Sequence, residues 1–288
     1  MMNRKIAFIG GDHRQTVALS LISEKYETAI FGFDSYDGNI GNAVRCKSVS
    51  DAVKGADAVV LPLPYTRDKL HIFTPLSRTE ILTEEVLELL EARSQLYGGM
   101  LDEYVTGRIR NAVDYYKSEQ LQIMNAVPTA EGAIAIAMNE LPVTLFECSA
   151  VVIGYGRVAK LLAHRLTALG ANVTVCARRE DDRAYAAAFG CSVVDFASLG
   201  SALETADVIF NSVPHHIISE DLYPCINRNT PFIDLASRPG GLDFEKAKQY
   251  GLNVIWALSL PGKVAPVTAG RIIAATLTKL LEGSANNA

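Results

Sequence analysis

The feature that most constrains the fold is a pattern of strand, glycine turn and helix that occurs twice along the chain. An apolar run at residues 5–9 ends in Gly10-Gly11, and a second run at residues 150–153 ends in Gly154-Tyr155-Gly156. Each turn is followed by a helical pattern and then by another short apolar run. Such strands, alternating with helices, are typical of parallel sheets covered on both faces. The sequence therefore predicts an α/β protein with two doubly wound parallel-sheet domains.

The length of the chain, 288 residues, also favours two domains, since one domain ordinarily has ~100–200 residues. We expect a flavodoxin-like substrate domain at residues 1–126 and a Rossmann NADP-binding domain at residues 127–266. A helix at residues 268–281 is expected to cross back, so that residues 267–288 belong to the first domain.

Three further segments carry specific expectations. A surface helix is predicted at residues 83–94. A helix at residues 128–139, starting after a proline and apolar on all sides, is predicted to be buried between the domains. Gly283 is a predicted helix stop, and residues 284–288 are predicted to form a frayed tail.

Composition excludes several classes of protein. The net charge of −5 and the pI near 5.6 disfavour nucleic-acid binding. No run approaches ~18 apolar residues, so we expect no membrane span. The chain begins directly with a strand, which leaves no room for a signal peptide and predicts a cytoplasmic protein. The five cysteines are widely spaced, which predicts neither a disulfide framework nor a metal site.

The strongest chemical signal is the run Gly154-Tyr155-Gly156-Arg157-Val158-Ala159, which fits Gly-x-Gly-x-x-Gly/Ala between a strand and a helix at residues 158–169. Gly154 allows the tight turn, Gly156 allows close approach of a pyrophosphate, and Ala159 allows close packing of helix on strand. The helix N-terminus would then offer N–H groups to the phosphates. The run predicts a dinucleotide site.

The end of the following strand, at residues 173–177, bears on the choice between NADP and NAD. An NAD site usually has an acidic residue about 20 residues after the first glycine. Here Ala177 is followed by Arg178 and Arg179, with no carboxylate before Glu180. Two guanidinium groups could pair with a 2′-phosphate, so NADP is favoured and NAD stays possible. If the arginines only form a solvated loop, no preference is expected.

Two later strand ends are expected to line the ligand crevice. The first carries Ser212, Val213 and Pro214, expected near the nicotinamide ribose; the histidines at 215 and 216 more simply form an exposed loop. The second carries Arg238, a cation suited to bidentate binding of a substrate carboxylate.

The position of Arg238 resembles that of the arginine that holds the substrate carboxylate in the D-2-hydroxyacid dehydrogenases. That family also uses a Glu–His pair, and the corresponding region here, residues 258–266, has no histidine. Without that acid–base group, oxidation of a simple alcohol is disfavoured.

A closer resemblance, to the family of the dipicolinate synthase A subunit, extends in order from residue 6 to about residue 282. It rests on these phrases: Gly10 to Gln15, Gly32-Phe33-Asp34, Pro128 to Gly132, Gly154 to Arg157, Ala177-Arg178, Asp234 to Gly241, and Leu260 to Pro266. The run from Asp234 to Gly241 is the most specific.

This resemblance implies an NADP-dependent oxidation of dihydrodipicolinate to pyridine-2,6-dicarboxylate in the mother cell of a sporulating bacterium, on a branch of lysine synthesis. It also implies that the flavin-binding B subunit of dipicolinate synthase is a partner, and we expect a homo-oligomer. Aromatisation supplies driving force, so the main task of the site is to position the ring against the nicotinamide.

A dicarboxylate substrate requires two clamps. Arg238, aided by Ser237 and the backbone of Gly240 and Gly241, is the first candidate. The second is the turn that carries Asp12, Arg14 and Gln15, although Arg14 is as readily solvated. Thr129 and Glu131 are expected at the same cleft, with Glu131 either the proton acceptor or a carboxylate favoured by the helix dipole.

Two alternatives stay open. The chain could be a two-domain dehydrogenase of another carboxylate, such as a hydroxy or amino acid. A site like that of alanine dehydrogenase would need a lysine and a histidine in the first domain, and Lys69 and His71 are close in sequence but lie in no recognisable motif. The chain could instead be a non-catalytic NADP-binding scaffold for the flavoprotein partner.

Overall fold

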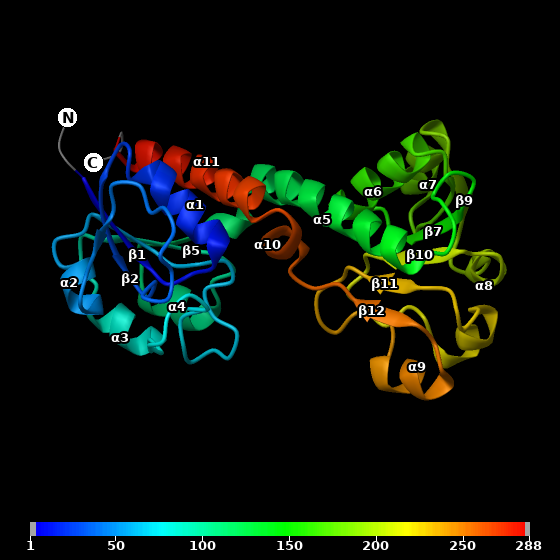
Figure 1. Cartoon of the computed structure of the whole chain (residues 1–288), viewed down its shortest axis with the longest axis horizontal. Helices are drawn as coiled ribbons and strands as arrows, with labels where there is room; N and C mark the ends of the chain where they lie inside the picture. Colours follow the sequence, from blue (N-terminus) through cyan, green and yellow to red (C-terminus); the bar gives the residue numbers. More distant parts are fainter. Residues whose placement is uncertain (1–3, 286–288) are drawn as a thin grey trace. The chain divides into compact units, whose positions relative to one another are not determined.

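The computed structural model describes residues 4–285, which fall into two compact units (Figure 1). The first unit comprises Met1–Asn125 and Ala265–Ala288, and the second comprises Ala126–Val264. Each unit contains a six-stranded parallel sheet. The two-sheet α/β class expected from the sequence is confirmed.

The first sheet has the order β3-β2-β1-β4-β5-β6. Its strands are β1 (Lys5–Ile9), β2 (Glu27–Phe31), β3 (Val44–Arg45), β4 (Ala58–Val60), β5 (Gln95–Gly98) and β6 (Ala112–Asp114). This is the Rossmann order, whereas a flavodoxin-like sheet runs 2-1-3-4-5. The difference rests on the two-residue edge strand β3, because the other five strands run β2-β1-β4-β5-β6, which is the order 2-1-3-4-5 expected for a flavodoxin-like domain.

Helices cover both faces of this sheet (Figure 1). Ile6 and Phe8 of β1 are buried with α1 (His13–Ile22) and α11 (Pro266–Ala285). Ala7 and Ile9 of the same strand face the other layer, which contains α2 (Val49–Val53), α3 (Thr83–Glu88) and α4 (Glu103–Arg108). Burial on both faces explains why the strands are almost wholly apolar. A short 3₁₀ helix, η1 (Tyr115–Lys117), follows β6.

The C-terminal helix α11 belongs to the first unit, where it packs along α1. Ile273, Leu277 and Leu281 of α11 are buried in the same core as β1. At Gly270 the two helices come so close that a Cβ would lie 2.5 Å from the carbonyl oxygen of Arg14. The packing of the last helix on the first domain is as expected.

The second sheet repeats the same order as β12-β11-β10-β7-β8-β9. Its strands are β7 (Ser149–Ile153), β8 (Asn172–Cys176), β9 (Ser192–Val194), β10 (Val208–Asn211), β11 (Phe232–Asp234) and β12 (Val254–Trp256). One face is covered by α6 (Arg157–Ala168), α7 (Glu180–Ala188) and much of α5 (Glu119–Glu140). The other carries α8 (Leu199–Glu204), η2 (Glu220–Cys225) and α9 (Phe244–Tyr250). The short α10 (Leu260–Val264) contacts α5 at Gly132.

The helix expected at residues 128–139 differs in two respects. It begins at Glu119, and Pro128 lies inside it. Ser118 marks the true start, because its hydroxyl accepts a hydrogen bond from Leu121 N at 3.3 Å. The helix is also not buried on all sides, since Met138 is 63% exposed.

Two other helix ends differ from expectation. The surface helix expected to reach Ser94 ends at Glu88, because the chain must turn before strand β5 pairs with β4. Gly283 does not stop the last helix, which continues to Ala285. The expected frayed tail is therefore helical at residues 284 and 285, and residues 286–288 lie outside the described residues.

Candidate functional site

The glycine turn of the second unit connects β7 to α6 and is open. Gly154 has a φ of +93°, which a side chain rarely adopts, and its N–H donates to Cys176 O at 2.8 Å. A Cβ added at Gly156 would meet no atom within 4 Å. Gly156 is also the N-cap of α6 and provides no side-chain cap. The turn thus has both the space and the helix N-terminus that a pyrophosphate requires.

The neighbours of this turn divide into buried and exposed residues. Tyr155 and Ala159 pack into the core of the unit, so they shape the turn from beneath. Arg157 is exposed and Val158 is half-buried at the start of α6.

The corresponding turn of the first unit is closed. A Cβ at Gly10 would lie 2.5 Å from Thr74 Cγ2 and 3.1 Å from Phe73 O, because the chain after β4 folds over it. Asp12 caps α1, since its carboxylate accepts from Arg14 N at 3.0 Å. A turn that is covered and already capped has no room for a pyrophosphate. The residues present therefore fit a dinucleotide in the second unit and not at this turn.

Three arginines near the end of β8 differ in their contacts. Arg179 pairs with Asp181 at 3.1 Å. Arg183 donates to the carbonyl oxygens of Ala177 and Arg178, at 2.8 and 3.0 Å, and so holds the backbone of this turn. Arg178 is exposed and, among the described residues, has no ion-pair partner. Arg178 is thus the cation available to a phosphate; the role of Arg183 could not be read from the sequence, because it depends on the fold of α7 back towards β8.

The end of β10 lies directly against the open turn. A Cβ at Gly154 would lie 2.5 Å from Ser212 Oγ and 2.9 Å from Val213 Cγ2. The Ser212 hydroxyl donates to Ile153 O at 3.0 Å. Pro214 and the two histidines that follow it are exposed. The structure therefore brings Ser212 and Val213 together with the glycine fingerprint.

The loop after β11 is organised by the buried carboxylate of Asp234. Its Oδ1 accepts from Asn211 Nδ2 at 2.8 Å and from Ala236 N at 2.9 Å, and its Oδ2 accepts from Gly241 N at 2.7 Å. Burial raises the pKa of Asp234 from its usual value, while these three bonds act in the opposite direction. Asp234 therefore ties both ends of the loop to β10. Sequence reasoning quoted Asp234 for its resemblance but missed this role.

Arg238 is exposed on this loop, with its Cζ 5.3 Å from the centre of the Trp256 ring. Among the described residues no carboxylate pairs with it. Ser237 is also exposed, and its carbonyl accepts from Gly240 N at 2.9 Å. The N–H groups of Gly240 and Gly241 are thus both bonded within the loop. The expectation that they donate to a substrate is not met in this conformation; Gly240, with a φ of +90°, serves the turn itself.

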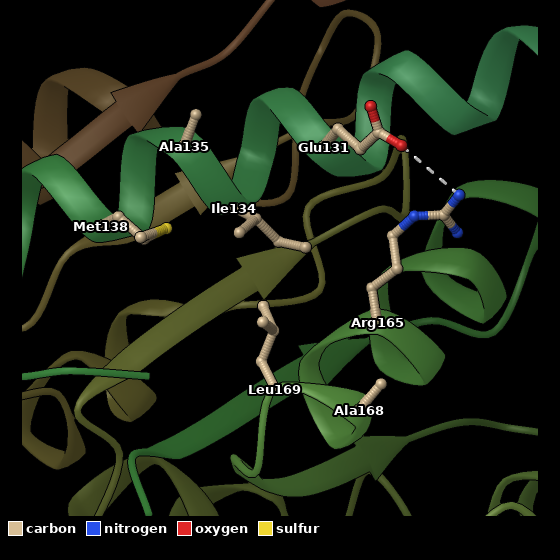
Figure 2. Close-up of a pocket in the computed structure, with 7 residues that line it drawn as sticks. All are labelled: Glu131, Ile134, Ala135, Met138, Arg165, Ala168 and Leu169. Carbon is tan, nitrogen blue, oxygen red and sulfur yellow. Dashed lines mark ion pairs between the residues drawn. The ribbon is translucent and has the colours of Figure 1, made fainter. Parts of the chain in front are cut away.

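Glu131 lies in a shallow groove between α5 and α6, where its carboxylate is 3.6 Å from Arg165 (Figure 2). The remainder of the groove is apolar and is lined by Ile134, Ala135, Met138, Ala168 and Leu169. Glu131 is therefore paired with a cation on α6. Thr129, two residues before it, is half-buried and has a bonding partner.

The expected substrate residues of the first unit are tied to one another. Arg14 is 7% exposed, pairs with Asp12 at 2.7 Å and also donates to Leu63 O. Gln15 is 1% exposed and its amide donates to Leu61 O at 3.4 Å. These contacts hold the turn and the chain after β4 in place.

Other expected features concern metals, thiols and the membrane. Within residues 4–285 no group of three or more His, Cys, Asp or Glu residues is placed to hold a metal ion, and the five cysteines are free. Burial raises the pKa of Cys148 to about 11, so that thiol stays protonated. No helix in the same range combines the length and apolar character that crossing a membrane requires.

In the first unit, His71 Nδ1 lies 2.7 Å from Asp68, which raises the pKa of His71.

The chain matches two family models. Residues 107–236 match the D-isomer specific 2-hydroxyacid dehydrogenase, NAD binding domain, and residues 5–119 match the N-terminal domain of the dipicolinate synthase A subunit. With the open glycine turn and the Rossmann strand order, these matches define the class of protein: the chain is an NAD(P)-dependent oxidoreductase.

Individual relatives narrow this class. The chain is 32% identical, over 96% of its length and 95% of the relative's, to the dipicolinate synthase A subunit of Bacillus subtilis (strain 168). It therefore belongs to the family of the dipicolinate synthase A subunit. The crystal structure of the Bacillus subtilis protein matches with a TM-score of 0.90 and 30% identity, over 100% of this chain and 99% of the other. The crystal structure of the A subunit from Bacillus halodurans matches with a TM-score of 0.90 and 32% identity, over 97% and 98%.

A more distant match shows the fold alone. The D-lactate dehydrogenase from Escherichia coli has a TM-score of 0.67 at 16% identity, over 98% of this chain and 97% of the other. The family expected from the sequence phrases is confirmed.

Proposed function

We propose that this chain oxidises dihydrodipicolinate to pyridine-2,6-dicarboxylate with NADP as the electron acceptor. The observation that carries the proposal is a continuous set of contacts along the carboxyl ends of three neighbouring strands. The open turn at Gly154 touches Ser212, and Asn211 bonds to Asp234, which holds the loop of Arg238. A cofactor site and a free guanidinium are thereby built on one sheet edge, where ligands of open α/β sheets bind.

The reaction removes one hydride and one proton from the substrate ring. The nicotinamide ring, when bound, supplies the chemistry of accepting that hydride. Gly154 and Gly156 leave space for the pyrophosphate, the N–H groups of α6 bind it, and Ser212 and Val213 border the ribose. Arg178 pairs with the 2′-phosphate, with Arg183 holding its backbone and Arg179 a weaker candidate because of its pairing with Asp181.

Arg238 binds one substrate carboxylate through two parallel N–H donors. Ser237 adds a hydroxyl from the same loop. For the second carboxylate we propose Arg14, which pairs with Asp12, with Gln15 and Thr129 as further contacts. Glu131 is the proposed proton acceptor; its contact with Arg165 gives it a second role in joining α5 to α6.

Because dihydrodipicolinate gains an aromatic ring on oxidation, the site has to orient the substrate more than to activate it. The relative's name also motivates a partner: we propose that a flavin-binding B subunit joins this chain, that the chain itself forms homo-oligomers, and that it acts in the mother cell during sporulation.

The test measures absorbance at the reduced-nicotinamide band for protein mixed with NADP and freshly generated dihydrodipicolinate, with NAD run in parallel. Reduced cofactor that appears together with pyridine-2,6-dicarboxylate supports the proposal. Turnover that begins only when the flavoprotein is added would favour the scaffold function instead. Reduction with a different carboxylate but not with this one would favour another dehydrogenase.

Arg238→Ala tests the substrate clamp. A bond to a charged group contributes about 1.5–3 kcal/mol, so we expect kcat/KM to fall by roughly 10- to 150-fold. Affinity for NADP should be unchanged. Arg228→Ala is the matched control, because Arg228 is exposed in the same unit and also lies over an aromatic ring, 5.6 Å from the centre of Tyr250. Equal kinetics for both variants would remove Arg238 from the site.

A further inference from the structure

Trp256, the one tryptophan of the chain, lies beside the loop that carries Arg238. It is the last residue of β12, whose register places it opposite Asp234 of β11. Its indole Nε1 donates to Ala236 O at 3.0 Å. Its ring stacks on Phe244, with centres 4.3 Å apart and planes inclined by 22°. The indole is thus fixed by a hydrogen bond at its edge and by an aromatic ring on its face.

The guanidinium of Arg238 lies within cation–π distance of this fixed ring, with Cζ at 5.3 Å from the ring centre. The guanidinium is planar and directs its N–H donors outward in that plane. An aromatic ring attracts the cation without a carboxylate that would take up its N–H donors, so those donors stay available for a substrate carboxylate. An acidic partner would instead have used the same donors that a substrate needs.

We propose that Trp256 is the positioning residue for Arg238: the face of the indole ring holds the guanidinium by a cation–π contact, so that its N–H donors are available to a substrate carboxylate. This inference rests on the proposed function, in which Arg238 binds that carboxylate. It assigns Trp256 no contact with substrate. The bond to Ala236 O orients the indole, and the interaction with Arg238 depends on the presence of a ring.

Two substitutions separate the ring from its N–H group. Trp256→Phe keeps an aromatic face and loses the donor to Ala236 O. Trp256→Leu loses both. Since cation–π pairs at partly exposed sites contribute roughly 0.5–2 kcal/mol, we expect Trp256→Leu to raise the KM for dihydrodipicolinate by about 2- to 30-fold. We expect the KM of Trp256→Phe to stay within about twofold of the wild type.

The control is Tyr250→Leu, which removes the ring beneath Arg228 in the same unit. We expect no change in its KM. The dissociation constant for NADP and the Tm are measured for every variant, because general damage to the unit would alter both. The double variant Trp256→Leu with Arg238→Ala should have the KM of Arg238→Ala alone, since Trp256 acts only through that arginine.

The same residue gives a second readout. Pyridine-2,6-dicarboxylate, the proposed product, is titrated into the protein with excitation restricted to Trp256. We expect the emission of Trp256 to change when the dicarboxylate binds Arg238. We expect the emission of the Arg238→Ala variant to stay unchanged during the same titration.

Three results would overturn the inference: a wild-type KM in Trp256→Leu, equal KM values in Trp256→Leu and Trp256→Phe, or additive effects in the double variant. These outcomes are separate from failure of the proposed function. If Arg238→Ala itself leaves KM unchanged, the carboxylate clamp is wrong. If Arg238→Ala raises KM and Trp256→Leu does not, only the role of Trp256 is wrong.

Discussion

Gly270 on α11 provides a direct test of how the last helix is held on α1. An added Cβ would lie 2.5 Å from Arg14 O, 2.6 Å from Val17 Cβ and 3.0 Å from Val17 Cγ1. Carbon atoms in ordinary contact are about 3.5–4.0 Å apart. The Gly270→Ala substitution therefore requires α1 and α11 to separate by about 1 Å. No change of rotamer can relieve the contact, because one of the atoms belongs to the backbone.

The size of the effect follows from two opposing contributions. Overpacking by a methyl group in a close-packed site costs about 1–3 kcal/mol. Replacing glycine by alanine inside a helix gains up to about 1 kcal/mol. The Gly283→Ala variant in the same helix measures the gain in helix propensity alone, because a Cβ there would meet nothing within 4 Å. The difference between the two variants isolates the cost of the close approach.

The assay is thermal unfolding of the wild type and both variants. At about 2–4 °C per kcal/mol for a protein of this size class, Gly270→Ala should unfold roughly 2–12 °C below Gly283→Ala. Gly283→Ala should unfold at or slightly above the wild-type temperature. Equal Tm values for the two variants would refute the argument that α11 rests directly on the backbone of α1.

Four further predictions follow from other contacts. Arg178→Asp should weaken NADP binding by well over tenfold and NAD binding far less, because the new carboxylate repels only the 2′-phosphate; calorimetry that shows equal losses would refute the assignment. Glu131→Gln should lower kcat if Glu131 accepts the proton, whereas a lower Tm with an unchanged kcat would leave it only the contact with Arg165. The hydrogen bonds from Ser77 and from Arg78 N lower the pKa of Asp34, so its stabilising effect is present above about pH 3.9 and is lost as pH falls through the lowered value; Asp34→Asn should reduce the Tm at pH 7 and flatten its decline below pH 4. Deletion of residues 267–288 should expose the core that α11 covers, with dye binding and a lower Tm, and an unaltered melting curve would contradict that packing.

Local patterns predicted much of this fold. The two glycine turns follow apolar runs that are buried on both faces, and such runs have few other structures available to them. Gly156 could be identified from its spacing because its requirement, an open turn before a helix, is local. Local patterns gave a wrong prediction at Pro128, because a proline is common at the first position of a helix but here lies inside α5. Here Ser118 supplies the cap, and burial of Leu121 at 1% exposure favours a helix that continues through the proline.

The candidate site was less predictable because its side chains meet across the sheet. Asp234, Asn211 and Trp256 come from three strands, and no spacing along the chain shows that they converge. The three arginines near β8 are equivalent in sequence. Only the fold of α7 shows that Arg183 is used on the backbone and Arg179 on an acidic neighbour, which leaves Arg178 available.

The two sheets share one strand order, yet only the second has an open glycine turn, and the length of one loop explains the difference. In the second unit the chain passes from β10 to η2 through Ser212–Ser219, which borders Gly154 without covering Gly156. In the first unit the equivalent connection runs from Leu61 to Leu82 and folds back over Gly10.

Asp34 holds the loop that covers Gly10 in place by accepting two hydrogen bonds from it. An acidic residue soon after the second strand of a Rossmann unit ordinarily accepts a bond from a ribose hydroxyl. In the first unit Asp34 instead accepts from Ser77 Oγ and from Arg78 N, both on the covering loop. The carboxylate that would bind a nucleotide in other Rossmann units thus binds the covering loop of this chain. The first unit keeps the Rossmann sheet but has its nucleotide turn filled, which leaves the dinucleotide to the second unit, where Arg178 follows the second strand and no carboxylate comes before Glu180.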